Sequence, residues 1–80
     1  MPHFVYILFS DTKCKFYCGS SVDVEARLAK HNSKATPSTR YGIPWKVVRI
    51  VECESKKAAL QLELRIKKRG IERWLSDHPA

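Results

Sequence analysis

The sequence predicts a small α/β (α+β) domain with a three-stranded, mostly antiparallel sheet flanked by helices, in the order β-β-α-β-α-α. Two patterns lead to this prediction. Short runs rich in β-branched and aromatic residues, bounded by turn residues, are typical of strands. Longer segments with apolar residues every three or four positions are typical of helices. Eighty residues leave room for one domain, residues 1–80, with one modest core.

The first strand is predicted at residues 4–9, where every residue is apolar or aromatic. Such a run suits a strand covered on both faces, so we expect it at the centre of the sheet. Residues 10–13 form a polar turn and residues 15–19 return as the second strand of a hairpin. The third strand is predicted at residues 45–53.

The first helix is expected to be capped by Ser20 or Ser21 and to run to about Asn32, with Asp23 and Glu25 in its first turn. A loop over residues 34–44 follows, with room for a short helical turn.

A second long helix is expected after its cap, Ser55, and should stop near Gly70, which favours a helix terminus. Residues 71–76 then form a last short helix, anchored to the body by Trp74 and Leu75.

The net charge of +7 comes from 15 basic against 8 acidic residues. Most of the basic residues fall into two clusters, and such a field attracts polyanions. The clusters are Arg27, Lys30, Lys34, Arg40, Lys46 and Arg49, then Arg65, Lys67, Lys68, Arg69 and Arg73. The alternative is a cationic face that serves only solubility.

Three cysteines cannot pair completely, which indicates a reducing compartment, and we expect a cytoplasmic protein. Cys14 and Cys18 are spaced C-x3-C, but no second pair follows and Cys53 falls in a predicted strand, so structural zinc is not expected. The longest apolar run is too short to cross a bilayer or to act as a signal sequence.

One carboxylate interrupts the buried face of the second long helix. Ala59, Leu62 and Ile66 form the apolar stripe, and Glu63 lies about 40° from Ala59 around the helix. An unpaired carboxylate there is costly to bury. In one interpretation, Glu63 forms a salt bridge, or its side chain extends past the edge of the core into solvent. In the other, this face of the helix lines a cleft in which Glu63 holds a hard divalent cation.

The first helix carries a similar anomaly. His31 lies on the face formed by Val24, Leu28 and Ala35, and Arg27 flanks it one turn earlier. His31 alone fits a hydrogen-bonded core histidine, and Arg27 alone fits a surface charge. Together in a basic protein they favour a phosphate site, because a guanidinium offers a charged fork for phosphoryl oxygens.

The hairpin contributes two phenols, Tyr6 and Tyr17, which could equally be core residues. Gly19 lets a backbone or a ligand approach closely. Residues 4–6 read Phe-Val-Tyr, residues 17–19 read Tyr-Cys-Gly, and Arg27 follows the second tyrosine by ten positions.

These positions, in this order, resemble the GIY-YIG nuclease superfamily. Residues 39–40 and 44–48 resemble the segment before its third strand, and residues 59–68 resemble its metal-binding helix. The chain is most similar to the small standalone bacterial branch (UPF0213-like) and to the N-terminal domains of excision endonucleases. Ser20 stands where some repair members carry a lysine, so that lysine's role is absent here.

The resemblance implies a divalent-metal-dependent endonuclease that hydrolyses phosphodiester bonds of DNA, in repair or at branched or damaged structures. Glu63 would hold one weakly bound Mg²⁺ or Mn²⁺ ion. Tyr17 or Tyr6, with His31, would position or deprotonate water, and Arg27 would neutralise charge on the phosphorane. We expect these five residues around one concave basic surface. The expected nucleic-acid-binding residues are Gly19, Lys30, Arg40, Lys46, Lys67 and Lys68.

Two alternatives remain open at this point. The domain could be a non-catalytic nucleic-acid-binding module that keeps the fold and the charge. The substrate could also be RNA, because single-strand stacking could use Trp45 or Tyr41. The sequence does not identify a protein that would recruit the domain to its substrate.

Overall fold

The computed structural model describes residues 1–34 and 36–79. Ala35, assigned above to the apolar face of the first helix, lies outside the described residues. No helix in the described part of the chain is long and apolar enough to cross a membrane.

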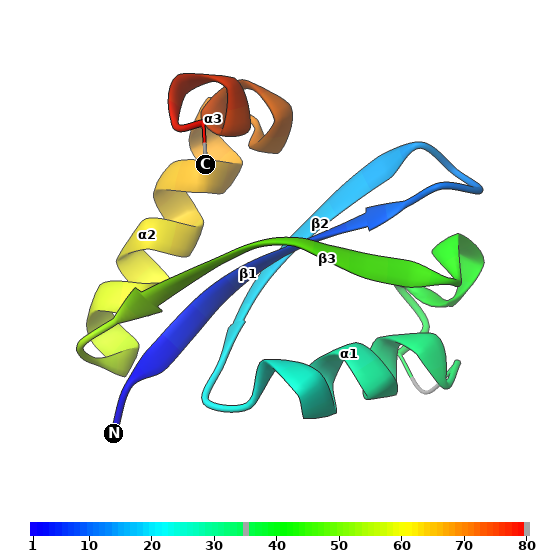
Figure 1. The fold of residues 1–80 in the computed structure, drawn as a ribbon, viewed down its shortest axis with the longest axis horizontal. Coiled ribbons are helices and arrows are strands. Elements are labelled where there is room, and N and C mark those ends of the chain that lie inside the picture. Colours follow the sequence, from blue (N-terminus) through cyan, green and yellow to red (C-terminus); the bar gives the residue numbers. More distant parts are fainter. Residues whose placement is uncertain (35, 80) are drawn as a thin grey trace.

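The sheet has three antiparallel strands in the order β2-β1-β3 (Figure 1). Strand β1 spans His3–Ser10, β2 spans Lys15–Ser21 and β3 spans Trp45–Cys53. The predicted fold class is confirmed, and the apolar run at residues 4–9 is central as expected. Because β2 is an edge strand, side chains from both faces of the sheet can meet at its open side.

The helices are divided between the two faces of the sheet (Figure 1). Helix α1 (Val24–Asn32) packs on one face, whereas α2 (Lys56–Arg69) and α3 (Ile71–Asp77) pack on the other. The loop before β3 contains a 3₁₀ turn, η1 (Arg40–Gly42). It is the short helical turn for which the sequence left room.

Alternate side chains of β1 feed two separate cores. Val5 and Ile7 point toward α2, where they pack with Ala59 and Ile66. Tyr6 and Leu8 point toward α1, and their cluster also contains Val24 and Trp45. The apolar run without polar alternation is therefore explained by burial on both faces.

The prediction that Ser20 or Ser21 caps α1 is wrong. The cap is Asp23, whose Oδ1 accepts a hydrogen bond from the Ala26 amide at 3.0 Å. Both serines instead belong to β2, where Ser21 pairs with Phe4. The Ser21 hydroxyl is also engaged with the backbone of Asp23, at 3.0 Å to its nitrogen and 3.1 Å to its oxygen.

The limits of α2 are as predicted. Ser55 Oγ accepts from the Ala58 amide at 3.1 Å, which caps the first turn. Gly70 ends the helix with a φ of 96°, a conformation that a side chain would disfavour.

Candidate active site

Tyr6 and Gly19 are paired across β1 and β2, and the phenol occupies the space that Gly19 leaves. A Cβ added to Gly19 would lie 2.6 Å from the Tyr6 hydroxyl oxygen and 3.3 Å from the ring of Tyr17. Glycine is therefore required at this position because the Tyr6 side chain passes directly over its backbone. Gly19 is buried, so the group that approaches its backbone closely is the Tyr6 side chain and not a ligand.

A directed chain of hydrogen bonds leads away from the Tyr6 hydroxyl. His31 Nε2 lies 3.1 Å from that hydroxyl, and His31 Nδ1 lies 2.9 Å from the hydroxyl of Thr39. Thr39 donates to the carbonyl oxygen of Thr36 at 3.3 Å, so it accepts from Nδ1. In a neutral imidazole protonated at Nδ1, Nε2 accepts the hydrogen bond of the Tyr6 hydroxyl.

The electrostatics of His31 agree with this tautomer. Burial lowers the pKa of His31, and the positive charges of Arg27 and Lys30 lower it further. His31 is 2 % exposed, and each ring nitrogen has a partner. Its geometry is that of a hydrogen-bonded core histidine which fixes the Tyr6 hydroxyl.

Tyr6 is held as a neutral phenol. Burial raises its pKa, hydrogen bonding and charge from Arg27 oppose the rise, and the charges of Tyr17 and Glu63 add to it. Tyr6 is 0 % exposed. The expectation that Tyr6 and His31 line an open concave surface is therefore wrong, since both are buried beneath it.

Arg27 lies beside the Tyr6 phenol, and this proximity is the main reason why the pKa of its guanidinium is raised. Its Nε is buried and, like that of Arg49, has no hydrogen-bond partner among the described residues. Buried donors of this kind are rare in folded proteins. The unpartnered N–H is consistent with a site for an external acceptor such as a phosphoryl oxygen.

Tyr17 is the more accessible of the two phenols. Its ring lies 4.8 Å from the His31 ring and 6.5 Å from the Tyr6 ring, measured between centroids. It also meets the indole of Trp45 edge-on at 6.3 Å. Tyr17 is half-buried, so its side chain connects the buried relay to the surface.

Glu63 forms an ion pair with Lys67, one turn later on α2, with 2.7 Å between Oε2 and Nζ. The carboxylate side chain is 16 % exposed and the lysine side chain 48 %. This is the salt bridge that the sequence left open as one alternative. The second alternative, a divalent cation on Glu63, would require the half-exposed Lys67 to leave Oε2.

Although α2 covers the face opposite α1, the charge of Glu63 has a small effect on groups of the neighbouring strands. Its charge contributes to the raised pKa of Tyr6. Burial and then Glu63 raise the pKa of Cys18 to about 11. Glu63 raises the pKa of Lys67, and the charge of Tyr17 adds a smaller rise.

The donor set at Glu63 bears on metal binding. The described residues contain no group of three or more His, Cys, Asp or Glu side chains that could hold an ion. One partly exposed carboxylate nevertheless fits Mg²⁺, which commonly keeps several waters and uses one or two protein carboxylates with substrate phosphates. Glu63 is the residue that would hold such an ion.

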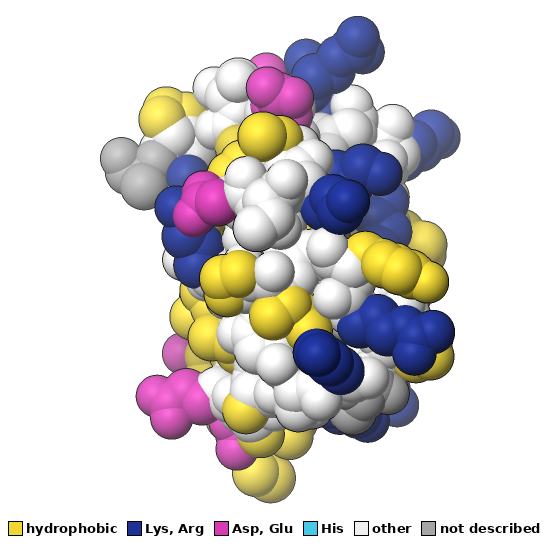
Figure 2. Space-filling view, turned by 90° about the vertical axis from the view of Figure 1, so that its right-hand side faces the viewer, with side chains coloured by type: hydrophobic (Ala, Val, Ile, Leu, Met, Phe, Trp, Pro, Cys, Tyr) yellow, Lys and Arg dark blue, Asp and Glu magenta, His cyan; other side chains and the backbone are white. Residues whose placement is uncertain are grey.

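The predicted nucleic-acid-binding residues are exposed apart from Gly19. Lys46 is paired with Asp11 at 3.3 Å, and the Arg40 guanidinium lies 5.7 Å from the centre of the Tyr41 ring. Lys30 and Lys68 make no ion pair within residues 1–34 and 36–79. Figure 2 shows basic side chains spread over the face at the hairpin end, with acidic ones toward its margins.

Sequence reasoning missed two supports of the site. Thr39 completes the relay, yet its loop position gives it no periodic signal. Asn32 binds the backbone of Trp45 at both ends, accepting from its nitrogen at 2.7 Å and donating to its oxygen at 3.1 Å. In the sequence, the only sign of this role is that Asn32 is a polar residue at the end of a predicted helix.

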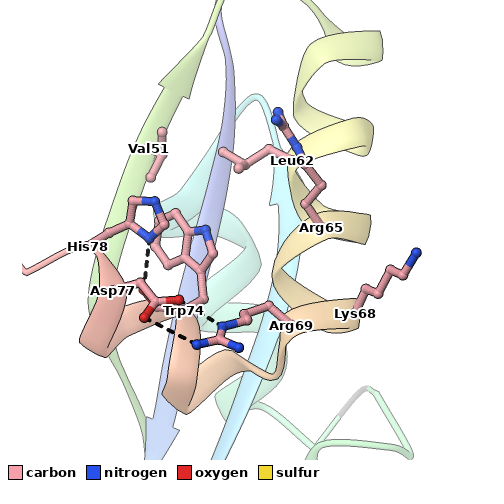
Figure 3. A pocket seen from close by; sticks show the side chains of 8 residues that line it. All are labelled: Val51, Leu62, Arg65, Lys68, Arg69, Trp74, Asp77 and His78. Atoms are coloured by element: carbon pink, nitrogen blue, oxygen red, sulfur yellow. Dashed lines mark hydrogen bonds and ion pairs between the residues drawn. The ribbon is translucent and has the colours of Figure 1, made fainter.

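Another cavity lies elsewhere, between α2, α3 and β3 (Figure 3). Its volume is ≈ 600 Å³, and its apolar wall includes Val51, Leu62 and Trp74. Two of the polar side chains on its rim, Arg69 and Asp77, are paired with each other at 2.8 Å. It is separate from the tyrosine cluster.

This fold, with two phenols, an arginine and a carboxylate in this order along the chain, points to a GIY-YIG domain. Residues 2–72 match the family model described as the GIY-YIG catalytic domain, so the chain belongs to this nuclease superfamily, whose members generally use a divalent metal. The resemblance drawn from the motifs is confirmed.

The similar proteins are UPF0213 proteins. One is UPF0213 protein YsiG of Lactococcus lactis subsp. lactis (strain IL1403), 39% identical over 62 residues, which are 76% of this chain and 59% of that protein. Another, from L. lactis subsp. cremoris (strain SK11), is 37% identical over 76% of this chain and 62% of its own length. The chain thus spans about three fifths of the length of these curated relatives.

A solved structure has the same fold. The solution NMR structure of a UPF0213 protein from Bacillus halodurans superimposes with a TM-score of 0.61 at 33% identity. The match covers 98% of this chain and 86% of that one. The chain is therefore a small member of the GIY-YIG family similar to the UPF0213 proteins.

Proposed function

We propose that this domain is a metal-dependent endonuclease that hydrolyses phosphodiester bonds of DNA. The observation that supports this most strongly is the buried, unpartnered Nε of Arg27 beside the Tyr6 phenol, in a strongly basic protein. A positive group with an unused donor suits a phosphate whose charge increases during the reaction.

Each residue of the cluster has a separate role in this proposal. Arg27 binds the phosphate and neutralises the charge that develops on it. Tyr17, the phenol nearer the surface, orients the attacking water through its hydroxyl group. Tyr6 and His31, being buried, are positioning residues: their hydrogen bond fixes the phenol oxygen against which Arg27 rests.

Glu63 is assigned as the carboxylate that holds the divalent ion. When bound there, the ion would supply Lewis-acid stabilisation of the phosphate and of the leaving oxygen. Lys67 must then release Oε2, and its ammonium group is exposed enough to move to a phosphate of the substrate.

The test is nicking of supercoiled plasmid by the purified protein, with and without Mg²⁺ or Mn²⁺. We expect nicking only with metal, and a loss of about a hundredfold or more for Arg27→Ala. Arg27→Lys, which keeps the charge but not the fork, should retain part of the rate. Arg73→Ala, an exposed arginine on α3, is the control and should cut normally.

The alternative is a binding module without catalysis, favoured by the closed Glu63–Lys67 pair. It forecasts no metal-dependent nicking on plasmid, branched or single-stranded DNA. Metal-dependent nicking that survives Arg27→Ala unchanged would instead contradict the proposed site.

A further inference from the structure

A smaller cavity adjoins Tyr17 at the hairpin end of the sheet. Its volume is ≈ 390 Å³, within the range of about 300–1,000 Å³ that is usual for small-ligand sites. It lies between the start of β2, η1 and the start of β3. Aromatic rings, two lysines and the glycine of η1 line it, among them Lys13, Lys15, Tyr17, Tyr41, Gly42 and Trp45.

The floor of this cavity is fixed before any ligand binds. Trp45 is 7 % exposed, and its indole nitrogen donates to the carbonyl oxygen of Thr39 at 2.6 Å. Gly42 lies against the indole so closely that an added Cβ would be 2.7 Å from Trp45 Cε2. The same Cβ would lie 3.1 Å from that of Ser10. The aromatic floor is therefore preorganised.

Tyr41 stands at the same cavity and is 71 % exposed. The Arg40 guanidinium lies over its ring at 5.7 Å from the centroid. An accessible aromatic ring with a cation beside it is the usual platform on which an unpaired base stacks, because every base has a π-face.

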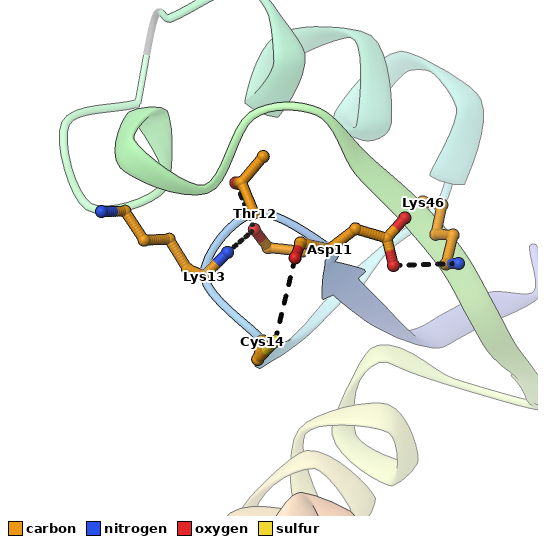
Figure 4. A network of polar contacts seen from close by, with 6 residues as sticks. Asp11, Thr12, Lys13, Cys14 and Lys46 are labelled. Atoms are coloured by element: carbon orange, nitrogen blue, oxygen red, sulfur yellow. Dashed lines mark hydrogen bonds and ion pairs between the residues drawn. The ribbon is translucent and has the colours of Figure 1, made fainter.

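The charge of the cavity also selects an anion. Its lining includes no acidic residue, and Lys13 and Lys15 make no ion pair in the described part of the chain. Asp11, the acidic residue of the hairpin turn, forms its ion pair with Lys46. Figure 4 shows Lys13 extending away from that pair. Two free ammonium groups beside aromatic rings are complementary to a phosphate attached to a base.

We propose that this cavity binds an unpaired nucleotide, with its base on Tyr41 and its phosphate between Lys13 and Lys15. Tyr17 lines the cavity and belongs to the candidate active site, so the strand held here leads to that site. The inference rests on the proposed function for this last step. It assigns the substrate class as strands with unpaired nucleotides, including branched structures, rather than continuous duplex.

The test compares dissociation constants without metal for a fluorescein-labelled oligo-dT strand and for a blunt duplex of the same length. Tyr41→Ala should weaken binding of the single strand by about five- to a hundredfold, the usual cost of losing a base-stacking ring, and binding of the duplex by less than about twofold. Tyr41→Phe keeps the ring and should bind like wild type. Lys13→Gln with Lys15→Gln should also weaken binding of the single strand, whereas Lys56→Gln with Lys57→Gln is the control of equal charge.

Equal losses for strand and duplex, or no loss with Tyr41→Ala, would overturn the inference. An RNA strand that behaves like the DNA strand supports it, because the cavity is assigned to base and phosphate. Failure of the proposed function is distinguishable: a protein that never cuts but binds unpaired strands through Tyr41 loses only its catalytic assignment. A protein that cuts duplex and branched DNA equally well, with or without Tyr41, loses only this inference.

Discussion

Tyr6 and Gly19 form one structural unit, since the phenol of the central strand fills the place where a side chain of the edge strand would stand. The separation of 2.6 Å between an added Cβ and the hydroxyl oxygen cannot be tolerated without movement. The relay to His31 and the contact with Arg27 both start from this hydroxyl. The position of the phenol therefore depends on a residue with no side chain.

Gly19→Ala should displace Tyr6 and destabilise the domain. Overpacking of this kind costs about 1–3 kcal/mol, and each kcal/mol lowers Tm by about 4–8 °C in a domain of this size. Thermal melts measure the effect, with Ser20→Ala on the same strand as the control. A Gly19→Ala variant that melts like wild type would show that the space over Gly19 can be vacated without cost.

Stability should fall as the pH drops below about 6.5, because His31 is neutral in the folded state. Its pKa in the folded protein is lowered, chiefly by burial, from an unfolded value of about 6.5. The unfolded chain then binds more protons in that range, so the stabilisation is complete above pH ~6.5 and is lost at lower pH. His31→Gln should flatten the curve of Tm against pH, whereas His3→Gln should leave its slope in place. Parallel curves for His31→Gln and wild type would contradict the assigned tautomer.

The reactivity of Cys18 should report on the charge of Glu63. In a Cys14→Ser, Cys53→Ser background only Cys18 remains, and its pKa of about 11, caused by burial and then by Glu63, should make it slow to react with a disulfide reagent. Glu63→Gln removes the second cause, so the reaction should become faster. Glu54→Gln, an exposed carboxylate before α2, is the matched control. Equal rates for the Glu63 and Glu54 variants in proteins with equal melts would place Glu63 away from the β2 edge.

Binding to DNA should weaken as salt rises, since Lys and Arg displace counterions from phosphates. Changing Lys67 and Lys68 together to Gln should lower affinity for all sequences and reduce the salt slope by roughly two. The exposed lysines at the start of α2, Lys56 and Lys57, are the control pair. An unchanged slope would move the interface to the loop around Arg40 and Lys46.

The fold was predictable because its decisive signals are local. Residues 4–9 are all apolar or aromatic, which favours the central strand. Ser55 and Gly70 mark the ends of α2 by their own chemistry. The cap of α1 was mispredicted because three candidates, Ser20, Ser21 and Asp23, stand close together. Ser20 and Ser21 are paired with β1, which leaves Asp23 as the cap. This pairing depends on residues far away in the chain, so the local sequence does not indicate it.

The sequence identifies the polar residues of the candidate site, but not the contacts among them. Tyr6 and His31 attract attention as polar groups in apolar runs, but only the structure gives the burial that makes them positioning residues. Thr39 and Asn32 act through contacts between segments far apart in the chain, which no spacing rule indicates. The partner of Glu63 was left open because an i,i+4 lysine is compatible with either a permanent or a temporary ion pair.

The most direct test of the account is a paired measurement on Glu63→Gln. The substitution keeps the shape of the side chain and removes the carboxylate assigned to the metal, without removing positive charge from the surface. We expect it to melt normally, to lose metal-dependent cleavage, and to bind DNA without metal as tightly as wild type or slightly more tightly. A Glu63→Gln protein that melts normally and still cuts at the wild-type rate would contradict Glu63 as the metal ligand and the mechanism built on it.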